Sequence, residues 1–146
     1  MTARVRPEDR ERARLLDEKD TAGDATPEES LEAFSLYWPS YFAEPAVAPP
    51  MPDVRFSGPA NQGLCADLAA RLPELEASLP SITVRFGVLV GERSPIPTHV
   101  GVDSAARIPG AWSYVVPGAG HLVWHEAPGS LLAAMDRLVA GTPARA

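Results

Sequence analysis

The chain has 146 residues, 45% of them hydrophobic, which is enough for one globular domain with a packed core. The formal net charge is −6 and no basic cluster occurs, so we expect no nucleic-acid partner, because phosphate recognition needs a clustered basic face. The single cysteine excludes an internal disulfide framework, and no run of ~20 apolar residues offers a membrane span.

The beginning of the chain predicts a cytoplasmic location. Met1 leads directly into alternating charges, without the apolar core that a signal peptide needs. Residues 21–50 carry five acids and no base, which is typical of a solvated face. We therefore expect a cytoplasmic protein that has no membrane partner.

Two helices are predicted before residue 40. Pro7 followed by acidic residues is typical of a helix start, because proline is tolerated in the first turn and the helix dipole favours acids there. This helix should run to about residue 20. Thr26 and Glu29 have the spacing of a capping box, which predicts a second helix through Tyr37. Pro39 should end that helix.

A proline-rich connector follows the second helix. Residues 39–59 hold six of the sixteen prolines, and such a segment cannot lie inside a sheet. We therefore divide the chain into a helical segment with its connector, residues 1–58, and an α/β part, residues 59–146.

The α/β part begins with a helix. Leucines recur at helical spacing between residues 61 and 79, with Pro73 demanding a kink or a break. Residues 83–90 are almost continuously apolar and rich in branched side chains, which predicts a strand buried on both faces of a parallel sheet. A helix at 98–107, a strand at 112–116 and a helix at 130–140 complete the β-α-β-α order of a parallel α/β fold.

The turns that follow the two strands resemble a known family. The first strand runs into Gly91-Glu92-Arg93-Ser94-Pro95, and the second into Pro117-Gly118-Ala119-Gly120-His121, with Trp124-His125-Glu126-Ala127-Pro128 after it. This order resembles the C-terminal third of an α/β-hydrolase. Residues 26–45 are similar to the helical cap of the proline-iminopeptidase-like branch. The resemblance implies a partial α/β-hydrolase fold, with a helical cap segment and the last two parallel strands with their flanking helices.

His121 is the residue to which the resemblance gives a catalytic role. In this family the histidine after the last strand accepts the proton of the nucleophile and later protonates the leaving group. Gly118 and Gly120 would let the backbone turn tightly enough to aim the ring. We expect His121 to act as a general base and acid.

The position of the acid departs from the family pattern. Family members commonly place an aspartate in the turn after the penultimate strand, where this chain has Ser94. A serine can hold the imidazole by a hydrogen bond but supplies no negative charge. Glu92 and Asp103 are nearby replacements, and an acid outside this chain is a third possibility.

The nucleophile is missing from the sequence. None of the ten serines has glycine both two residues before and two residues after it, as the Gly-x-Ser-x-Gly elbow requires. Because the family order is nucleophile, acid, histidine, we expect the nucleophile to lie N-terminal to this segment and outside this chain. One internal alternative is Cys65, which Gly63 precedes by two residues, although its expected role is that of a small helix residue packing under the core.

Aromatic residues are the candidates for a substrate pocket. Trp38, Tyr41 and Phe42 lie in the segment that resembles a cap, and Trp124 follows the histidine turn. Phosphate-loop, dinucleotide, zinc and calcium motifs do not occur, so we expect no cofactor and no metal.

Three hypotheses for the function remain, and the first two come from different classes. The first is the C-terminal fragment of an α/β-fold hydrolase that acts on a small ester, amide or related substrate, supplies the catalytic histidine and is inactive alone. Two strands are too few for such a sheet, so an exposed sheet edge should also promote self-association. The second is a non-catalytic binding or pairing module, or a degenerate relic of the fold. A thiol hydrolase using Cys65 and His121 is a third hypothesis.

Overall fold

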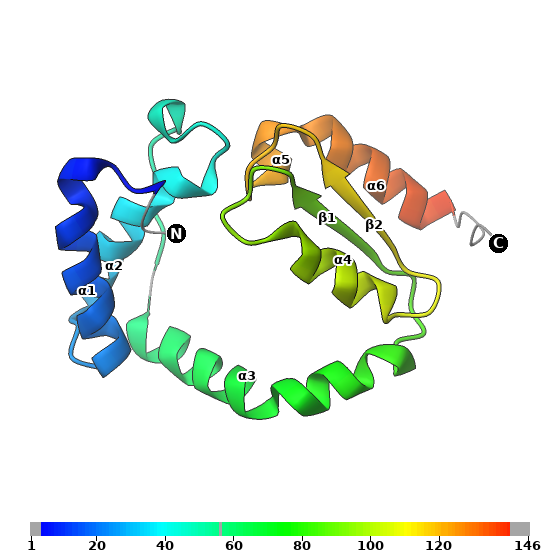
Figure 1. Cartoon of the computed structure of the whole chain (residues 1–146), viewed down its shortest axis with the longest axis horizontal. Coiled ribbons are helices and arrows are strands. Elements are labelled where there is room, and N and C mark those ends of the chain that lie inside the picture. Colours follow the sequence, from blue (N-terminus) through cyan, green and yellow to red (C-terminus); the bar gives the residue numbers. More distant parts are fainter. Residues whose placement is uncertain (1–3, 56, 141–146) are drawn as a thin grey trace. The chain divides into compact units, whose positions relative to one another are not determined.

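The computed structural model describes residues 4–55 and 57–140, and the chain forms two compact units, Met1–Leu72 and Pro73–Ala146 (Figure 1). The division lies inside helix α3 (Gly58–Ser78), whereas the sequence suggested a boundary between residues 58 and 59. The difference has a local cause. Gly58 contacts the Ser30 side chain so closely that an added Cβ would lie 2.8 Å from Ser30 Oγ, so the first turn of α3 belongs with the helices before it.

The first unit is built on helices α1 (Arg10–Ala22) and α2 (Pro27–Tyr37). The expected helix start at Pro7 is instead a 3-10 turn over Pro7–Asp9, and α1 follows it directly. Helix α1 ends at Gly23, whose φ of 82° is a left-handed conformation that costs glycine little. Further 3-10 turns cover Trp38–Tyr41 and Pro45–Val47 in the proline-rich connector.

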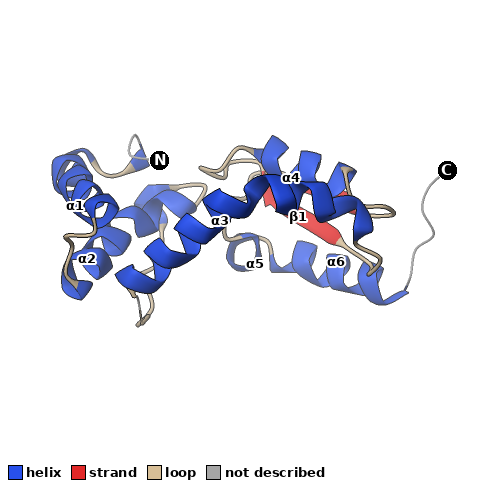
Figure 2. Cartoon of the chain, turned by 90° about the horizontal axis from the view of Figure 1, so that it is seen from below, coloured by secondary structure: helices blue, strands red, loops and turns tan. Residues whose placement is uncertain are grey.

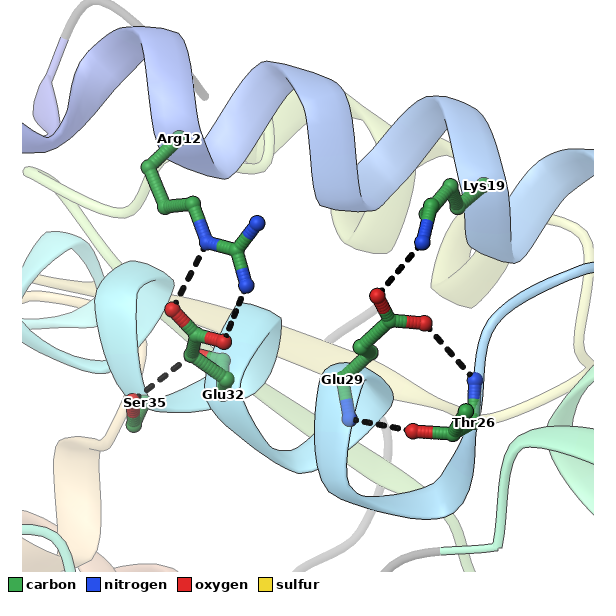
Figure 3. A network of polar contacts seen from close by, with 6 residues as sticks. All are labelled: Arg12, Lys19, Thr26, Glu29, Glu32 and Ser35. Atoms are coloured by element: carbon green, nitrogen blue, oxygen red, sulfur yellow. Dashed lines mark hydrogen bonds and ion pairs between the residues drawn. The ribbon is translucent and has the colours of Figure 1, made fainter.

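The predicted capping box at the start of α2 is confirmed (Figure 3). Thr26 Oγ1 accepts a hydrogen bond from Glu29 N at 3.2 Å, and Glu29 Oε2 accepts one from Thr26 N at 3.0 Å. The other oxygen of Glu29 accepts from Lys19 Nζ at 2.5 Å, and this bond is the main reason that the pKa of Glu29 is lowered. Arg12 and Glu32 form a second bridge from α1 to α2.

The core of the first unit lies between α1, α2 and the connector. Leu16 and Val5 are 1% and 2% exposed, and Ala13, Ala33 and Phe42 are also buried. Arg4 closes this core by donating from Nη2 to the carbonyl oxygens of Phe42 and Ala43, at 2.6 and 3.1 Å. The chain before α1 is therefore attached to the connector that follows α2.

The leucine stripe of α3 is not buried among the described residues. Leu64, Leu68 and Leu72 are 67%, 49% and 47% exposed. Of the kink or break expected at Pro73, the break does not occur, because Pro73 lies inside the continuous helix. Helical periodicity therefore predicts this element correctly but does not predict what would cover its apolar face.

The second unit is a two-stranded parallel sheet with helices on both sides. Strand β1 (Gly87–Gly91) pairs with β2 (Trp112–Val116) in the register Gly87 to Trp112 and Gly91 to Val116. Helix α4 (Thr98–Ala106) connects the strands, and α5 (Val123–Glu126) and α6 (Pro128–Ala140) follow β2. In Figure 2, α4 and α6 lie on opposite sides of β1. The part of the chain that the structure describes is thus a mixed α/β protein with two parallel strands.

The expected strand over residues 83–90 was wrong in two respects. The strand begins at Gly87, where the Trp112 ring lies so close that an added Cβ would be 2.3 Å from it. Its first four residues are only partly buried, and Gly91 alone is buried. In the described chain β1 has β2 as its only neighbouring strand, so the burial expected inside a wide sheet is incomplete.

Several large apolar side chains of the second unit remain exposed. The core cluster consists of Val116, Ala119 and Val123, with Leu89 and Ala127 packed against it. The exposed side chains that lie on β2 and α6 are Tyr114, Val115, Leu132, Met135 and Val139. Within the described ranges, no helix combines the length and apolar character needed to cross a bilayer.

Candidate functional site

The turns after β1 and β2 are in direct contact. Parallel strands end at the same edge of a sheet, which brings the two turns together. Arg93 N donates to Ala119 O at 2.8 Å across this contact. A Cβ added to Gly91 would lie 1.8 Å from Gly120 O, so a glycine is needed for this approach. The close packing of backbone on backbone holds residues after Gly91 beside residues after Gly120.

Ser94 and His121 meet at this contact. Ser94 Oγ lies 3.1 Å from His121 Nδ1, and Ile96 N donates to the same oxygen at 3.1 Å. Ser94 N donates to Gly91 O, which closes the turn that carries the hydroxyl. The two residues named from the sequence as the histidine and the acid position are thus hydrogen-bonded partners.

A serine holds an imidazole differently from a carboxylate. A carboxylate only accepts, so it favours the tautomer with hydrogen on Nδ1 and leaves Nε2 as the basic nitrogen. A hydroxyl can accept from Nδ1–H or donate to bare Nδ1. Ser94 therefore orients the His121 ring without selecting its tautomer and without stabilising its cation by a negative charge.

The environment of His121 favours the neutral imidazole. The side chain is partly buried, and this burial lowers its pKa below the ordinary value of 6.5 because desolvation penalises the cation. A neutral imidazole at pH 7 can accept a proton, which is the first task of a general base.

The two alternative acids occupy different places. Glu92 lies on the turn after β1, and its Oε2 accepts a hydrogen bond from Gly118 N at 2.9 Å. Asp103 is exposed on α4, outside the residues that line the cavity beside His121. Of Ser94, Glu92 and Asp103, Ser94 is the one that a hydrogen bond joins to the imidazole, at 3.1 Å.

Sequence reasoning missed one carboxylate near the histidine. Glu126 on α5 accepts a hydrogen bond through Oε2 from Gly120 N at 2.7 Å. The available signal was its spacing, because an acid five residues after His121, at the end of a short helix, can fold back onto the turn. That spacing by itself does not indicate a bond to a backbone amide.

An open cavity of about 290 Å³ lies beside the pair. Ser94 and His121 are its polar side chains, and the rest of its lining is mostly aliphatic. Trp124, named from the sequence as a pocket residue, lines this cavity and is 58% exposed. The other side chains that line it include Leu89, Val90, Ile96, Pro97 and Val100. A small, largely apolar group fits such a lining.

The aromatic residues of the cap-like segment pack together in the first unit. The rings of Trp38 and Phe42 are 5.3 Å apart in an edge-to-face arrangement, and Phe42 is 3% exposed. Trp38 Nε1 donates to Pro49 O at 2.9 Å. Tyr41 is tilted against Phe34, and burial raises its pKa. These contacts hold the connector against α2.

Cys65 is exposed on α3, which corrects the expectation that it packs under the core. Residues 63–67 all lie inside this helix, so Cys65 does not sit on the strand-to-helix turn that an elbow nucleophile needs. Within residues 4–55 and 57–140, no group of three or more histidine, cysteine or acidic side chains is arranged to hold a metal ion.

Comparisons with protein-family models, with curated proteins and with solved structures find no match for this chain. The site is therefore defined by its own geometry, namely a partly buried imidazole, a hydroxyl on its Nδ1, and an adjoining apolar cavity.

Proposed function

We propose that this chain is the histidine-bearing part of an α/β-fold hydrolase acting on a small ester, amide or related substrate. His121 is its general base and acid, and a segment outside these 146 residues supplies the nucleophile. One observation carries the proposal, namely the 3.1 Å contact between Ser94 Oγ and His121 Nδ1 where two parallel strands end. Active sites of open α/β sheets characteristically lie at that edge.

The proposed chemistry is acyl transfer with His121 as the proton carrier. Ser94 engages Nδ1, and Nε2 takes the proton of the nucleophile as its oxygen or sulfur attacks the carbonyl carbon. The imidazolium then gives this proton to the leaving alcohol or amine. In the second half, His121 takes a proton from water as the water attacks the acyl group, and returns it to the nucleophile.

Incomplete burial supports a sheet that continues beyond these residues. In the described part of the second unit β1 pairs on one side only, and α6 carries the exposed Leu132 and Met135. A parallel sheet is normally covered on both faces and along most of its edges. Further strands beside β1 would bury this surface and bring a nucleophile toward His121.

The test is complementation. The chain is mixed with, or extended by, an N-terminal segment that contains a strand and a Gly-x-Ser-x-Gly elbow, and hydrolysis of a p-nitrophenyl ester is measured. We expect activity only when both parts are present, and loss of that activity with His121→Ala. His99→Ala, an exposed residue of α4, is the matched control and should leave activity unchanged. Turnover by the isolated monomeric chain would contradict the proposal.

Ser94 also favours a second candidate, a non-catalytic binding or pairing module derived from the same fold. A neutral hydroxyl gives the imidazolium none of the electrostatic stabilisation that a carboxylate would give. If the mixture is no more active than its parts, and Ser94→Asp does not change that result, the binding module is supported.

A further inference from the structure

We infer that Glu126 and Glu92 are positioning residues, which hold the histidine turn through its backbone amides from two sides. The histidine turn is defined here as residues 117–121. The catalytic meaning of this inference rests on the proposed function, but the holding of the turn does not.

The turn carries two amide groups that carboxylates bind. Glu92 Oε2 accepts from Gly118 N at 2.9 Å, and Glu126 Oε2 accepts from Gly120 N at 2.7 Å. A hydrogen bond to an ionised acceptor is shorter and roughly twice as strong as a neutral one. Gly118 has a φ of 71°, so the turn uses a left-handed conformation that its own backbone does not strongly prefer. External bonds to its amides therefore contribute to its shape.

The two carboxylates come from different elements. Glu92 belongs to the turn after β1, while Glu126 belongs to α5, the short helix after the histidine turn. Glu126 is itself fixed, because its backbone N donates to Leu122 O at 3.1 Å and its side chain is partly buried. The histidine turn is thus attached to the sheet edge at Gly118 and to α5 at Gly120.

Glu126 should influence the imidazole more strongly than Glu92. Glu126 binds the amide of the Ala119–Gly120 peptide plane, and only the φ and ψ bonds of Gly120 separate that plane from the peptide plane that leads into His121. Gly118 lies three residues before His121, so Glu92 acts through more rotatable bonds. Loss of the Glu126 bond should therefore disturb the contact between Ser94 and His121 first.

The experiment is NMR on the full chain, measuring amide hydrogen exchange at Gly120 and the ring ¹⁵N shifts of His121 at pH 8. We expect Glu126→Ala to accelerate Gly120 exchange by about tenfold or more, and to change the ring shifts as Nδ1 leaves Ser94. Glu126→Gln keeps an acceptor oxygen at the same reach and should rescue the ring shifts. Glu92→Ala should affect Gly118 exchange and change the ring shifts less.

The matched control is Asp136→Ala, which removes an exposed carboxylate from α6. It should leave Gly120 exchange and the His121 ring shifts as they are in the wild type. Unchanged exchange and ring shifts in Glu126→Ala would overturn the inference, and so would equal effects of Glu126→Ala and Glu126→Gln on the ring. If Glu126→Ala does not fold, the Glu126→Gln and Glu92→Ala spectra still decide the question.

These measurements separate the inference from the proposed function. The NMR readouts need no turnover, so an inactive complemented protein with the expected spectra would overturn the hydrolase proposal alone. An active complemented enzyme whose rate and pH profile are the same in Glu126→Ala would overturn the positioning role alone.

Discussion

Ser94 Oγ lies 3.1 Å from His121 Nδ1, although the two residues are 27 positions apart in the chain. The parallel pairing of β1 and β2 and the absence of a side chain at Gly91 bring them together. Their contact contains no formal charge.

Replacement of Ser94 by aspartate should raise the pKa of His121 by about one to three units. A carboxylate at this position would favour the imidazolium and offset the lowering that burial causes. NMR titration of the ring protons measures the shift. Ser94→Ala serves as the comparison, because it removes the hydrogen bond without adding charge. A His121 pKa in Ser94→Asp that equals the wild-type value would show that a charge at residue 94 does not affect the protonation of the ring.

The lowered pKa of His121 makes stability depend on pH. The unfolded chain binds the proton more readily than the folded chain. The contribution of His121 to the free energy of unfolding is therefore at its full value above the ordinary pKa of 6.5, and it is lost as pH falls through the lowered pKa of the folded state. Urea unfolding of wild type and His121→Gln between pH 8 and about 5 measures this loss. The difference between the two proteins should change in this window, and a constant difference would contradict the prediction.

Gly91→Ala should destabilise the second unit by about 1–3 kcal/mol. The new methyl would lie 1.8 Å from Gly120 O and 2.5 Å from Ala119 O, so the two turns would have to separate. The contact between Ser94 and His121 should be lost as well. Denaturant unfolding measures the first effect and the His121 ring shifts the second.

Gly129→Ala is the matched control for Gly91→Ala. Gly129 lies in the first turn of α6, and an added Cβ there meets nothing within 4 Å. It should be neutral or slightly stabilising, because alanine is the better helix former. Equal stability changes at the two glycines would argue against a close approach at Gly91.

Thr26→Ala should lower the free energy of unfolding by about 1 kcal/mol. The hydroxyl accepts the Glu29 amide at the start of α2, and alanine would leave that amide without its cap. Thr26→Ser keeps the acceptor and should retain most of the stability. Urea unfolding monitored by helical circular dichroism tests both variants, and a Thr26→Ala midpoint equal to that of wild type would refute the role of the cap.

The isolated chain should self-associate. Leu132 and Met135 on α6 are 62% and 53% exposed, and β1 has an unpaired edge in the described chain. Sedimentation velocity should detect dimers or larger species, and Leu132→Glu combined with Met135→Glu should shift the population toward monomer. A wild-type chain that is monomeric at every concentration tested would contradict this expectation.

Local patterns in the sequence predicted local structure well. The capping box of Thr26 and Glu29 and the strand at Trp112–Val116 are both confirmed, because their determinants lie within a few residues. The start of β1 could not be predicted in the same way. It depends on Gly87 lying against the Trp112 ring, a contact with a residue far away in the chain.

The candidate site shows the same division. The turns after the two strands identify Ser94 and His121, and their meeting follows from parallel strand order. The bond from Glu126 to Gly120 N depends on how α5 turns back after His121, which no residue spacing specifies. The exposure of Cys65 could not be predicted either, because it depends on what lies beside α3.

The parallel pairing of β1 and β2 also determines when the site can form during folding. Pairing of parallel strands cannot start at a tight hairpin turn and extend from there, because the chain must first cross over through α4 to bring β2 beside β1. Non-local contacts of this kind form slowly relative to helices, because the loop must close before they are gained. An early state with α4 formed but undocked would have helices of this unit without its paired strands, and the contact between Ser94 and His121 would be absent. Formation of the contact between Ser94 and His121 should therefore be one of the last events in the folding of the second unit.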